Sequence, residues 1–451
     1  MAAKIFRDPL YNYISIDRER DGWLLQLLDC PEVQRLRRIH QLGVSYFTYP
    51  GADHSRLSHS LGVLHLCQEA LRHLETLTQD AQADAARHPL LAAALVHDVG
   101  HGPFSHLFEP CLDIKHEIWS CNIIRSTESK VHQVLQDIDS HLPERVAALV
   151  EKNNFTPALW QKNLLASQLD VDRLDYLRRD SLFTGAGYGH FDWYRILHTF
   201  VLHGSIDKDR DLVWTDKAKY AIEEYIFARF YMYENVYMHK TTRGFEKLLQ
   251  AMWNRAKRLR QDGTAVNLVP TIAEFWEGTT PSVRQYLALE EYTVLSQIQA
   301  WTEHSDRALN DLARRFLNRQ GFAAIDAPRQ SGVIADNLND WEAELRRLVA
   351  RQGYEPAELY ALRDDLETKI YEAYFPEKEE QEQGPINAIR LRLDESAEPK
   401  EISSLLSRLQ AVTNKPAVQV RYYVPKELRA DVVRLRRSWE QSQYLPGDFI
   451  I

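Results

Sequence analysis

The sequence predicts a mainly α-helical protein with a small α+β subdomain at its C-terminal end. Apolar residues recur at spacings of three and four, the period of an amphipathic helix, in four segments: 23–36, 57–74, 89–96 and 164–177. Residues 388–393 and 418–424 instead alternate apolar and polar side chains, as strands do. A chain of 451 residues exceeds one typical domain, so we expect a large helical core followed by an appendage.

The core is expected to span residues 1–321 and to include one or two long helices over 216–252. Within that segment tyrosines recur every four residues along one helix face, with an arginine among them. The arginine suggests that this face lines a site for an anion. A charged connecting region, 322–384, follows, and its part 352–383 is predicted to be helical. The C-terminal subdomain, 385–451, is expected to have this order of elements: strand 388–393, helix 401–412, strand 418–424 and a helical tail over 431–441.

The composition restricts the class of protein. Apolar residues make up 44% and charged residues 26%, which is the balance of a soluble globular protein. The net charge of −9 gives no general affinity for nucleic acid or acidic membranes. The four cysteines form no CxxC pair and are interpreted as reduced thiols. Since the sequence has no apolar run of membrane-spanning length and no signal-peptide core, we expect a cytoplasmic protein.

Four residues in three segments suggest a metal site: His59, the adjacent pair His97-Asp98, and Asp172. Nitrogen and oxygen donors together favour Mn, Fe or Zn. Four protein ligands leave open positions, where a bound water can become hydroxide near neutral pH, so a hydrolase is predicted. A His-Asp pair alone is often only a helix end. Three further histidines argue against that interpretation because they follow within twenty residues: His101, His106 and His116.

The residues near this pair favour a phosphorus electrophile. The three histidines can act as general acids or as phosphate-binding cations. Arg56, Arg173 and Arg229 can neutralise phosphate oxygens by forked hydrogen bonds. On the predicted helix over 170–180, helical period gives Asp172, Asp175, Tyr176 and Arg179 a common face. Asp170 is a candidate for holding a histidine in its tautomer.

Several motifs resemble one known family. They are residues 29–37, 41–43, 49–62, the His-Asp segment 95–106, Lys115-His116-Glu117 and residues 170–180. Over about 4–321 the chain resembles the HD-superfamily deoxynucleoside triphosphate (dNTP) triphosphohydrolases, both the bacterial enzymes and the SAM-and-HD-domain enzyme. Three segments look like the bacterial branch: 179–185, 311–319 and 425–427. No SAM domain is expected before Lys4.

The resemblance implies a reaction. His59, His97, Asp98 and Asp172 would bind the catalytic metal, whose hydroxide would attack the α-phosphorus and release deoxynucleoside and intact triphosphate. Asp98 would also belong to the catalytic set. His106 would protonate the 5′ oxygen. His101 and His116 would hold the α-phosphate, with Mg as a second ion.

The resemblance also implies a substrate pocket. Arg56, Arg173 and Arg229 would grip the triphosphate, and Arg173 replaces a common lysine. Gln41 and Asp180 would contact the sugar 3′-hydroxyl. The remaining roles concern the sugar ring: Tyr176 and Leu42 would crowd C2′, and Tyr237 would support the sugar. The pocket would select deoxyribose because these side chains would fill the space that a 2′ oxygen of ribose occupies.

A nucleotide-responsive oligomer is a further implication of the resemblance. Lys4, Asp29 and Arg37 match positions of an activating site for GTP or a dNTP between subunits, and Gln34 lies near that site. We therefore expect a homo-oligomer, a dimer or tetramer. Arg7 and the pair Tyr11-Asn12 depart from the usual residues nearby. The plain alternative is that the arginines over 35–38 form an ordinary basic helix face.

Two other functions stay open at the level of sequence. The His-Asp site alone also suits an HD-type phosphodiesterase or nucleotidase acting on a cyclic or modified nucleotide, and the sugar-contact residues argue against it. A non-catalytic nucleotide sensor or nucleic-acid binder is disfavoured because all four metal positions are intact and the net charge is negative.

Overall fold

The computed structural model divides the chain into two compact units, each built from separate stretches of sequence. Unit 1 contains Met1–Val236, Glu274–Glu291 and Lys369–Lys415, and unit 2 contains Tyr237–Ala273, Tyr292–Thr368 and Pro416–Ile451. The structure describes residues 3–77, 81–107, 109–112, 115–151, 154, 156–204, 210–276, 281–330, 333–335, 338–368, 388–394, 397–410 and 417–442. The domain limits expected from the sequence, near 321 and 384, remain a prediction about which pieces fold independently.

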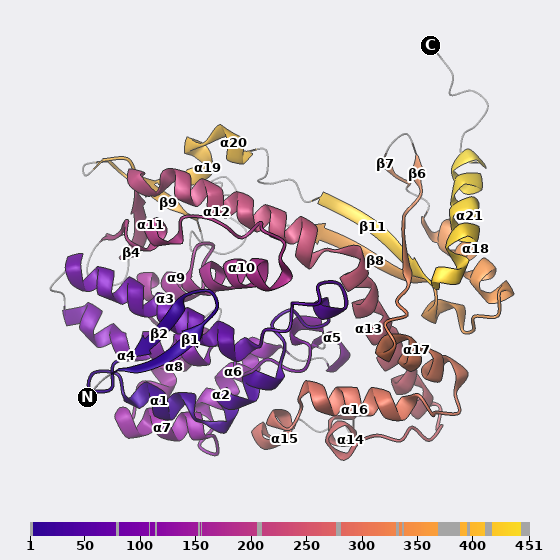
Figure 1. Ribbon diagram of the computed structural model, residues 1–451, viewed down its shortest axis with the longest axis horizontal. Coiled ribbons are helices and arrows are strands. Elements are labelled where there is room, and N and C mark those ends of the chain that lie inside the picture. Colours follow the sequence, from indigo (N-terminus) through magenta and orange to yellow (C-terminus); the bar gives the residue numbers. More distant parts are fainter. Residues whose placement is uncertain are drawn as a thin grey trace, which may run out of the picture. The chain divides into compact units, whose positions relative to one another are not determined.

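Unit 1 is mainly helical, as predicted. Its core is formed where α3 packs against α4 and α10 (Figure 1). The helices are α1 (Trp23–Leu28), α2 (Pro31–Arg35), α3 (Arg56–Leu77), α4 (Ala81–Val96), α5 (Glu109–Leu112), α6 (His116–Arg125), α7 (Lys130–Ile138), α8 (Leu142–Val150), α9 (Leu159–Leu165), α10 (Val171–Thr184), α11 (Trp193–Leu197), α12 (Lys219–Met232) and α15 (Val283–Leu287).

Two of the predicted helices are interrupted at residues that start a new helix. Pro31 occupies the first position of α2, where its missing N–H costs nothing, so 23–36 is divided into shorter helices. Asp170 caps α10 by accepting a hydrogen bond from Arg173 N, and the chain before it is not helical. α4 ends at Val96, so His97 and Asp98 lie directly after a helix, beside a glycine-rich turn as predicted.

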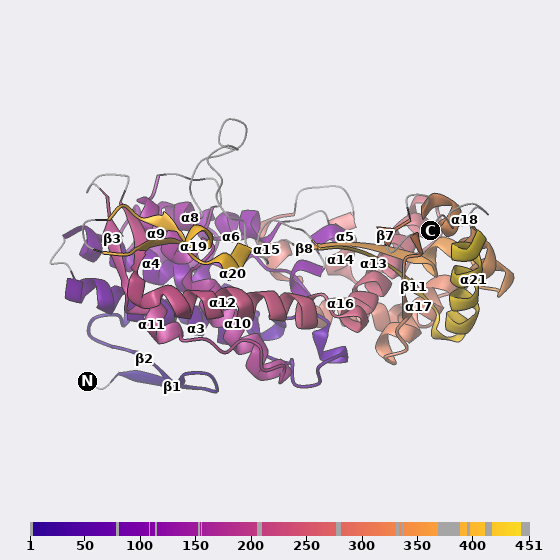
Figure 2. The ribbon, with the colours of Figure 1, turned by 90° about the horizontal axis from the view of Figure 1, so that it is seen from above.

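Two small sheets belong to unit 1. Strands β1 (Lys4–Asp8) and β2 (Asn12–Ile16) form an antiparallel hairpin along one edge of the unit, beside α3 and α11 (Figure 2). The second sheet has the order β10-β9-β4-β3, with β3 (Phe200–His203), β4 (Asp211–Thr215), β9 (Arg390–Arg392) and β10 (Lys400–Glu401). β9 runs parallel to β4 and antiparallel to β10. The short helices α19 (Ile402–Leu405) and α20 (Ser407–Gln410) follow.

Unit 2 combines helices with a three-stranded antiparallel sheet of order β5-β11-β8. Its elements are α13 (Lys240–Gln261), α17 (Arg307–Leu317), β5 (Ala323–Asp326), β6 (Arg329–Gln330), β7 (Val333–Ile334), α18 (Leu338–Arg351), β8 (Leu362–Thr368), β11 (Ala417–Val424) and α21 (Arg429–Ser442). A π-helix over Tyr233–Tyr237 precedes α13, so the predicted helical segment 216–252 is not continuous. α14 (Pro270–Trp276) and α16 (Glu291–Trp301) each run from a stretch of one unit into a stretch of the other.

One predicted helix is wrong. Residues 362–368, inside the segment 352–383, form strand β8, and residues 369–383 lie outside the described part of the chain. The strand is stabilised by antiparallel pairing along β11 and by buried Asp364, which accepts hydrogen bonds from Arg243 and Lys247. Asp364 is therefore one of the charged residues that suggested a solvated helix, but it is buried and paired inside unit 2.

The two C-terminal strands predicted from alternation are present, but they join different sheets. β9 pairs with β4 in unit 1, and β11 pairs with β5 and β8 in unit 2. The predicted tail helix is confirmed as α21. Among the residues that the structure describes, none of the helices is both long and apolar enough to cross a membrane.

Candidate metal centre

Three elements of unit 1 bring four donor side chains together, a set called here the metal-donor group: His59 on α3, His97 and Asp98 directly after α4, and Asp172 in the first turn of α10. His59 Nε2 lies 3.0 Å from Asp172 Oδ1 and 3.8 Å from Asp98 Oδ2. His97 Nε2 lies 3.4 Å from Asp98 Oδ1 and 3.9 Å from Asp172 Oδ1. Each of the four residues predicted as ligands therefore has a donor atom within 4 Å of a donor atom of another member.

The donor set fits a divalent cation. His97 Nε2 is buried and has no hydrogen-bond partner among the described residues, which is costly unless another species binds there. Burial opposes protonation of His59, but hydrogen bonds and charges from Asp172 and Asp175 outweigh it and raise its pKa to about 10. The group therefore attracts positive charge, and a metal ion can take the place of the proton. His59, His97 and Asp98 could hold such an ion, with mixed donors that suit a transition metal.

Asp98 is kept as a carboxylate by its neighbours. Arg56 Nη1 donates to Asp98 Oδ2 at 2.6 Å, and His101 Nε2 lies 3.3 Å from Asp98 Oδ1. Burial alone would raise the pKa of Asp98, but the charge of Arg56, helped by the neighbouring His97 and by a hydrogen bond from His101, holds it well below its usual range. The structure thus pairs Arg56 with Asp98. Its predicted contact with a triphosphate remains a prediction.

A second cluster adjoins the metal-donor group through Asp98, and we call it the acid–base cluster: His101, His106, Glu109 and His116. Glu109 Oε1 lies 3.0 Å from His106 Nδ1 and 2.7 Å from His116 Nδ1. The rings of His101 and His116 stack with centroids 3.7 Å apart. Although burial opposes it, hydrogen bonding to His106 and His116 lowers the pKa of Glu109 to about 2. One carboxylate therefore orients two histidines by Nδ1 and leaves their Nε2 atoms for other partners.

Sequence reasoning did not single out Glu109 as a site residue. Its signal was its position three residues after His106, a spacing at which two side chains of a helix would be neighbours. Burial and the charge of Arg56 lower the pKa of His101 well below its usual value, so this ring is neutral. His106 differs from it because its side chain is 68% exposed. His106 is therefore the member of the cluster that is open to solvent and to a substrate.

The loops around both clusters are held by buried polar contacts. Arg35 donates to His101 O at 2.8 Å, and Tyr286 donates to Gly100 O at 2.5 Å. Glu291 accepts from His40 N at 2.7 Å and from Phe104 N at 3.1 Å. A Cβ on Gly100 would lie 2.1 Å from Ser120 N, so only glycine allows α6 to approach this closely. These contacts fix the turn that carries the histidines.

Two residues of the predicted sugar pocket meet through His54. His54 Nε2 lies 2.7 Å from Asp180 Oδ1, and Gln41 N donates to His54 O at 3.0 Å. The His54 ring stacks on Phe183 with centroids 4.6 Å apart. Leu42 follows Gln41 in the same partly buried loop. His54 is a residue that sequence reasoning missed, and its only signal was its place inside segment 49–62.

Three other predicted substrate residues lie on α10 or contact the chain just before it. The rings of Tyr176 and His59 have centroids 6.4 Å apart. Arg173 donates to Ser167 O at 2.7 Å and to Tyr176 Oη at 3.4 Å. Arg229 is buried on α12 and donates to Gln168 Oε1 at 3.5 Å. Tyr237 belongs to unit 2.

The carboxylate that holds His59, a predicted metal ligand, is Asp175, and the expectation for Asp170 is wrong. Asp175 Oδ2 lies 2.8 Å from His59 Nδ1, which presents Nε2 of this ring to the metal-donor group. Asp170 instead accepts from Arg173 N and Ser167 N, each at 2.7 Å, as the cap of α10. Asp175 reaches His59 on α3 because it lies more than one helical turn further along α10 than Asp170.

The residues matched to an activating nucleotide are mostly at the surface. Lys4, Asp29 and Arg37 are exposed and Gln34 is partly buried. Gln34 Nε2 donates to Leu28 O at 2.8 Å, and Arg37 Nε donates to Gln34 Oε1 at 2.7 Å. Lys4 Nζ lies 5.5 Å from the ring centroid of Phe6. Their role in nucleotide binding remains a prediction.

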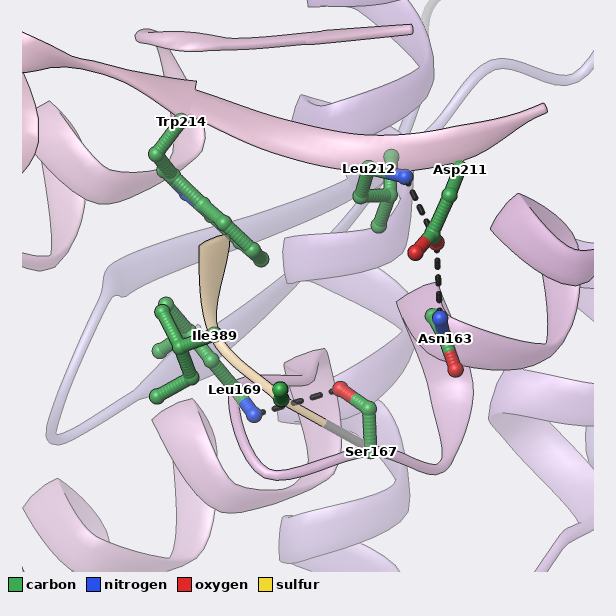
Figure 3. A pocket seen from close by; sticks show the side chains of 8 residues that line it. Asn163, Ser167, Leu169, Asp211, Leu212, Trp214 and Ile389 are labelled. Carbon is green, nitrogen blue, oxygen red and sulfur yellow. Dashed lines mark hydrogen bonds between the residues drawn. The ribbon is translucent and has the colours of Figure 1, made fainter. Parts of the chain in front are cut away.

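A small polar pocket lies between α9, β4 and the segment before β9 (Figure 3). Asp211 accepts hydrogen bonds there from Asn163 Nδ2 at 2.7 Å and from Arg390. None of the residues predicted for the site lines this pocket. We therefore assign no part of the chemistry to it.

Comparison with known proteins places these donors in one domain. Residues 56–180 match the HD domain, and this stretch contains His59, His97, Asp98 and Asp172. The chain is 34% identical over 429 residues to the uncharacterized protein YwfO of Bacillus subtilis, covering 95% of this chain and 93% of that protein. It is 29% identical over 286 residues to the deoxynucleoside triphosphate triphosphohydrolase SAMHD1 of Gallus gallus. That match covers 56% of this chain and 45% of the relative.

Solved structures share the fold over nearly the whole chain. A phosphohydrolase from Bacteroides thetaiotaomicron superposes with a TM-score of 0.76 at 27% identity, covering 94% of this chain and 99% of that one. A hypothetical protein from Aquifex aeolicus gives a TM-score of 0.69 at 24% identity. The second likeness concerns the fold alone.

Proposed function

We propose a substrate and a reaction on the premise that this chain belongs to the HD-domain family of metal-dependent phosphohydrolases. The chain would hydrolyse dNTPs to deoxynucleoside and inorganic triphosphate by attack of water at the α-phosphorus. One observation carries the proposal: Asp98 Oδ1 lies 3.4 Å from His97 Nε2 of the metal-donor group and 3.3 Å from His101 Nε2 of the acid–base cluster. This adjacency supports a Lewis acid and a proton-transfer group acting side by side.

A divalent ion held by His59, His97, Asp98 and Asp172 would lower the pKa of a water molecule and so supply the nucleophile. We propose Mn, Fe or Zn for this ion, with Mg as a second ion. The chain's own residues do the rest. Arg56 keeps Asp98 anionic, and Asp175 holds Nδ1 of His59, which would leave Nε2 free to bind such an ion. Exposed His106, oriented by Glu109, would give a proton to the leaving 5′ oxygen.

Preference for a deoxyribose would depend on the loop that carries Gln41 and Leu42. The pair His54–Asp180 fixes one carboxylate beside this loop, where it could accept a hydrogen bond from a 3′-hydroxyl. Tyr176, next to His59, would fill the space of a 2′ oxygen. The name of the relative SAMHD1 supports a dNTP as substrate. Arg173 and Arg229 would neutralise the triphosphate, and Tyr237 would support the sugar.

Regulation and assembly are parts of the same proposal. GTP or a dNTP would activate the enzyme at a site that includes Lys4, Asp29, Gln34 and Arg37. Because these side chains are at or near the surface, the site would be completed by a second copy in a dimer or tetramer. The protein would act in the cytoplasm on free nucleotides.

The test is a product assay. Metal-free protein is incubated with each dNTP and NTP plus Mn²⁺, with and without GTP, and products are separated by anion-exchange chromatography. We expect deoxynucleoside and triphosphate in equal amounts from dNTPs. The variant His97→Ala should be inactive, whereas His88→Ala, an exposed histidine on α4, should keep full activity. Monophosphate and pyrophosphate as the only products would overturn the proposed bond cleavage, and equal rates with NTPs would overturn the sugar preference.

A further inference from the structure

The turn of hairpin β1–β2 is connected to the metal-donor group by three consecutive hydrogen-bonded side chains. Tyr11 Oη donates to Asp175 Oδ1 at 2.8 Å. The other oxygen of Asp175 lies 2.8 Å from Nδ1 of His59. The N-terminal hairpin, α10 and α3 thus contribute one residue each to a path that ends at a predicted metal ligand.

Every hydrogen-bonding position of Asp175 that faces these elements is used. Arg179 Nε donates to Oδ2 at 2.9 Å and Arg179 Nη2 to Oδ1 at 3.0 Å, so each oxygen accepts two hydrogen bonds. Asp175 and Arg179 are fully buried and His59 is 1% exposed. In such surroundings the loss of the Tyr11 hydroxyl would leave Oδ1 with one donor, Arg179 Nη2, in place of two, so the carboxylate would turn toward its remaining partners. A rotation of Asp175 would move the His59 ring.

Asp8 fixes the position of Tyr11 at the start of this path. Asp8 Oδ1 accepts from Leu10 N at 2.9 Å and from Tyr11 N at 3.0 Å, which shapes the turn. Asp8 Oδ2 accepts from Arg179 Nη1 at 2.8 Å. The hairpin is therefore bound to α10 at two points, and the hydroxyl of Tyr11 is held over Asp175 by the backbone as well as by its own ring contacts.

α3 has room for this network because residue 62 is glycine. A Cβ at Gly62 would lie 1.8 Å from Asp175 Oδ1 and 2.5 Å from Arg179 Nη2. Glycine inside a helix costs about 1 kcal/mol relative to alanine, so its presence one turn after His59 requires a reason. The close approach of the Asp175–Arg179 pair to α3 is that reason.

We infer that Tyr11 is a positioning residue for His59: it acts through Asp175, and hairpin β1–β2 thereby sets the affinity of the metal-donor group for its ion. This inference rests on the proposed function only in taking His59 as a metal ligand. It adds Tyr11, a residue that is not among those proposed to contact the substrate. Loss of its hydroxyl should weaken metal binding.

The test is the affinity of metal-free protein for Mn²⁺, measured by electron paramagnetic resonance of the free ion. Tyr11→Phe removes only the hydroxyl and keeps the ring against His65 and Trp193. Tyr13→Phe, in the same hairpin but exposed, is the matched control. We expect a Kd for Mn²⁺ about three- to tenfold higher for Tyr11→Phe, about 10- to 100-fold higher for Asp175→Asn, and unchanged for Tyr13→Phe.

The double variant Tyr11→Phe/Asp175→Asn separates this route from a general loss of stability. If Tyr11 acts through Asp175, the double variant should bind Mn²⁺ like Asp175→Asn alone, whereas independent effects would multiply. Circular dichroism of the metal-free proteins verifies folding. Should Asp175→Asn fail to fold, the comparison of Tyr11→Phe with Tyr13→Phe decides alone.

Two results would overturn the inference. One is a Kd for Tyr11→Phe equal to that of the wild type, and the other is a multiplicative effect in the double variant. The proposed function fails differently. Wild-type protein that binds Mn²⁺ but releases no triphosphate contradicts the proposed reaction and leaves the positioning role in place. Wild-type protein that binds no Mn²⁺ would overturn both.

Discussion

His54 Nε2 lies 2.7 Å from Asp180 Oδ1, and both side chains are buried. The pair joins the loop before α3 to the middle of α10, and the ring of His54 is further held by stacking on Phe183. Asp180 therefore has a fixed orientation before any substrate arrives. A carboxylate held in this way can distinguish ligands by whether they offer a hydroxyl at one position.

The first prediction concerns this pair. His54→Ala should leave Asp180 without its buried partner and lower kcat/KM for dATP by about 10- to 100-fold, since a hydrogen bond to a charged group contributes about 1.5–3 kcal/mol. His54→Gln, which keeps a donor, should recover part of the loss. Steady-state rates with dATP and with 2′,3′-dideoxyATP, which lacks the 3′-hydroxyl, measure the effect. If discrimination between these two substrates is the same in wild type and His54→Ala, Asp180 does not act through His54.

The second prediction concerns metal removal. Chelation should lower the thermal unfolding temperature of the wild type, and Mn²⁺ should restore it, because a ligand that binds only the folded state stabilises it. At a hundred times its Kd the ion contributes about 2.7 kcal/mol. Differential scanning calorimetry with and without Mn²⁺ measures this shift. His97→Ala should show no Mn²⁺-dependent shift, while His88→Ala, on the helix that ends just before His97, should behave like wild type. A shift retained in His97→Ala would contradict the ligand assignment.

The third prediction concerns Gly62. Alanine has the higher helix propensity by about 1 kcal/mol, yet Gly62→Ala should destabilise the protein because its Cβ would overlap Asp175. Overpacking of this kind costs about 1–3 kcal/mol, so a modest net loss in the free energy of unfolding is expected by urea titration. Ser60→Ala is the control on α3: its buried hydroxyl has no hydrogen-bond partner among the described residues, so its loss should be neutral or stabilising. Stabilisation by Gly62→Ala would refute the tight contact.

The fourth prediction is a pH dependence at Glu109. Its pKa in the folded state is lowered from 4.5 to about 2, so the folded carboxylate is stabilised relative to the unfolded chain. That stabilisation is fully present above pH 4.5 and is lost as the pH falls toward 2. Wild type should therefore be more stable than Glu109→Gln near pH 6, and the difference should shrink below pH 4.5. Urea titrations of both proteins between pH 3 and 7 check this. A difference that is constant, or that grows in acid, would contradict the assigned contacts with His106 and His116.

Local pattern predicted much of what this chain forms. Helical period located α3 and the end of α4, and so placed His97-Asp98 beside a glycine-rich turn. Alternation located β9 and β11. These features were readable because they depend on neighbours within a few residues, where the period of the backbone decides which side chains share a face.

Pairing between distant segments was not readable in this way. Charge content suggested a helix where β8 forms. The strand was missed because the partner that stabilises β8 lies some fifty residues away on β11. The two C-terminal strands looked like one subdomain, and β9 and β11 belong to different sheets. Alternation identifies a strand but carries no information about which edge it joins.

The sequence by itself determined the chemistry available: two histidines and two aspartates with metal-ligating side chains, and further histidines and arginines suited to phosphate. Tertiary structure alone decided how those groups are oriented. It selected Asp175 over Asp170 to hold His59, turned Arg56 toward Asp98, and joined His54 to Asp180. The reason is physical: residue type sets what a side chain can bind, but burial and packing between α3, α4 and α10 set which partner it meets.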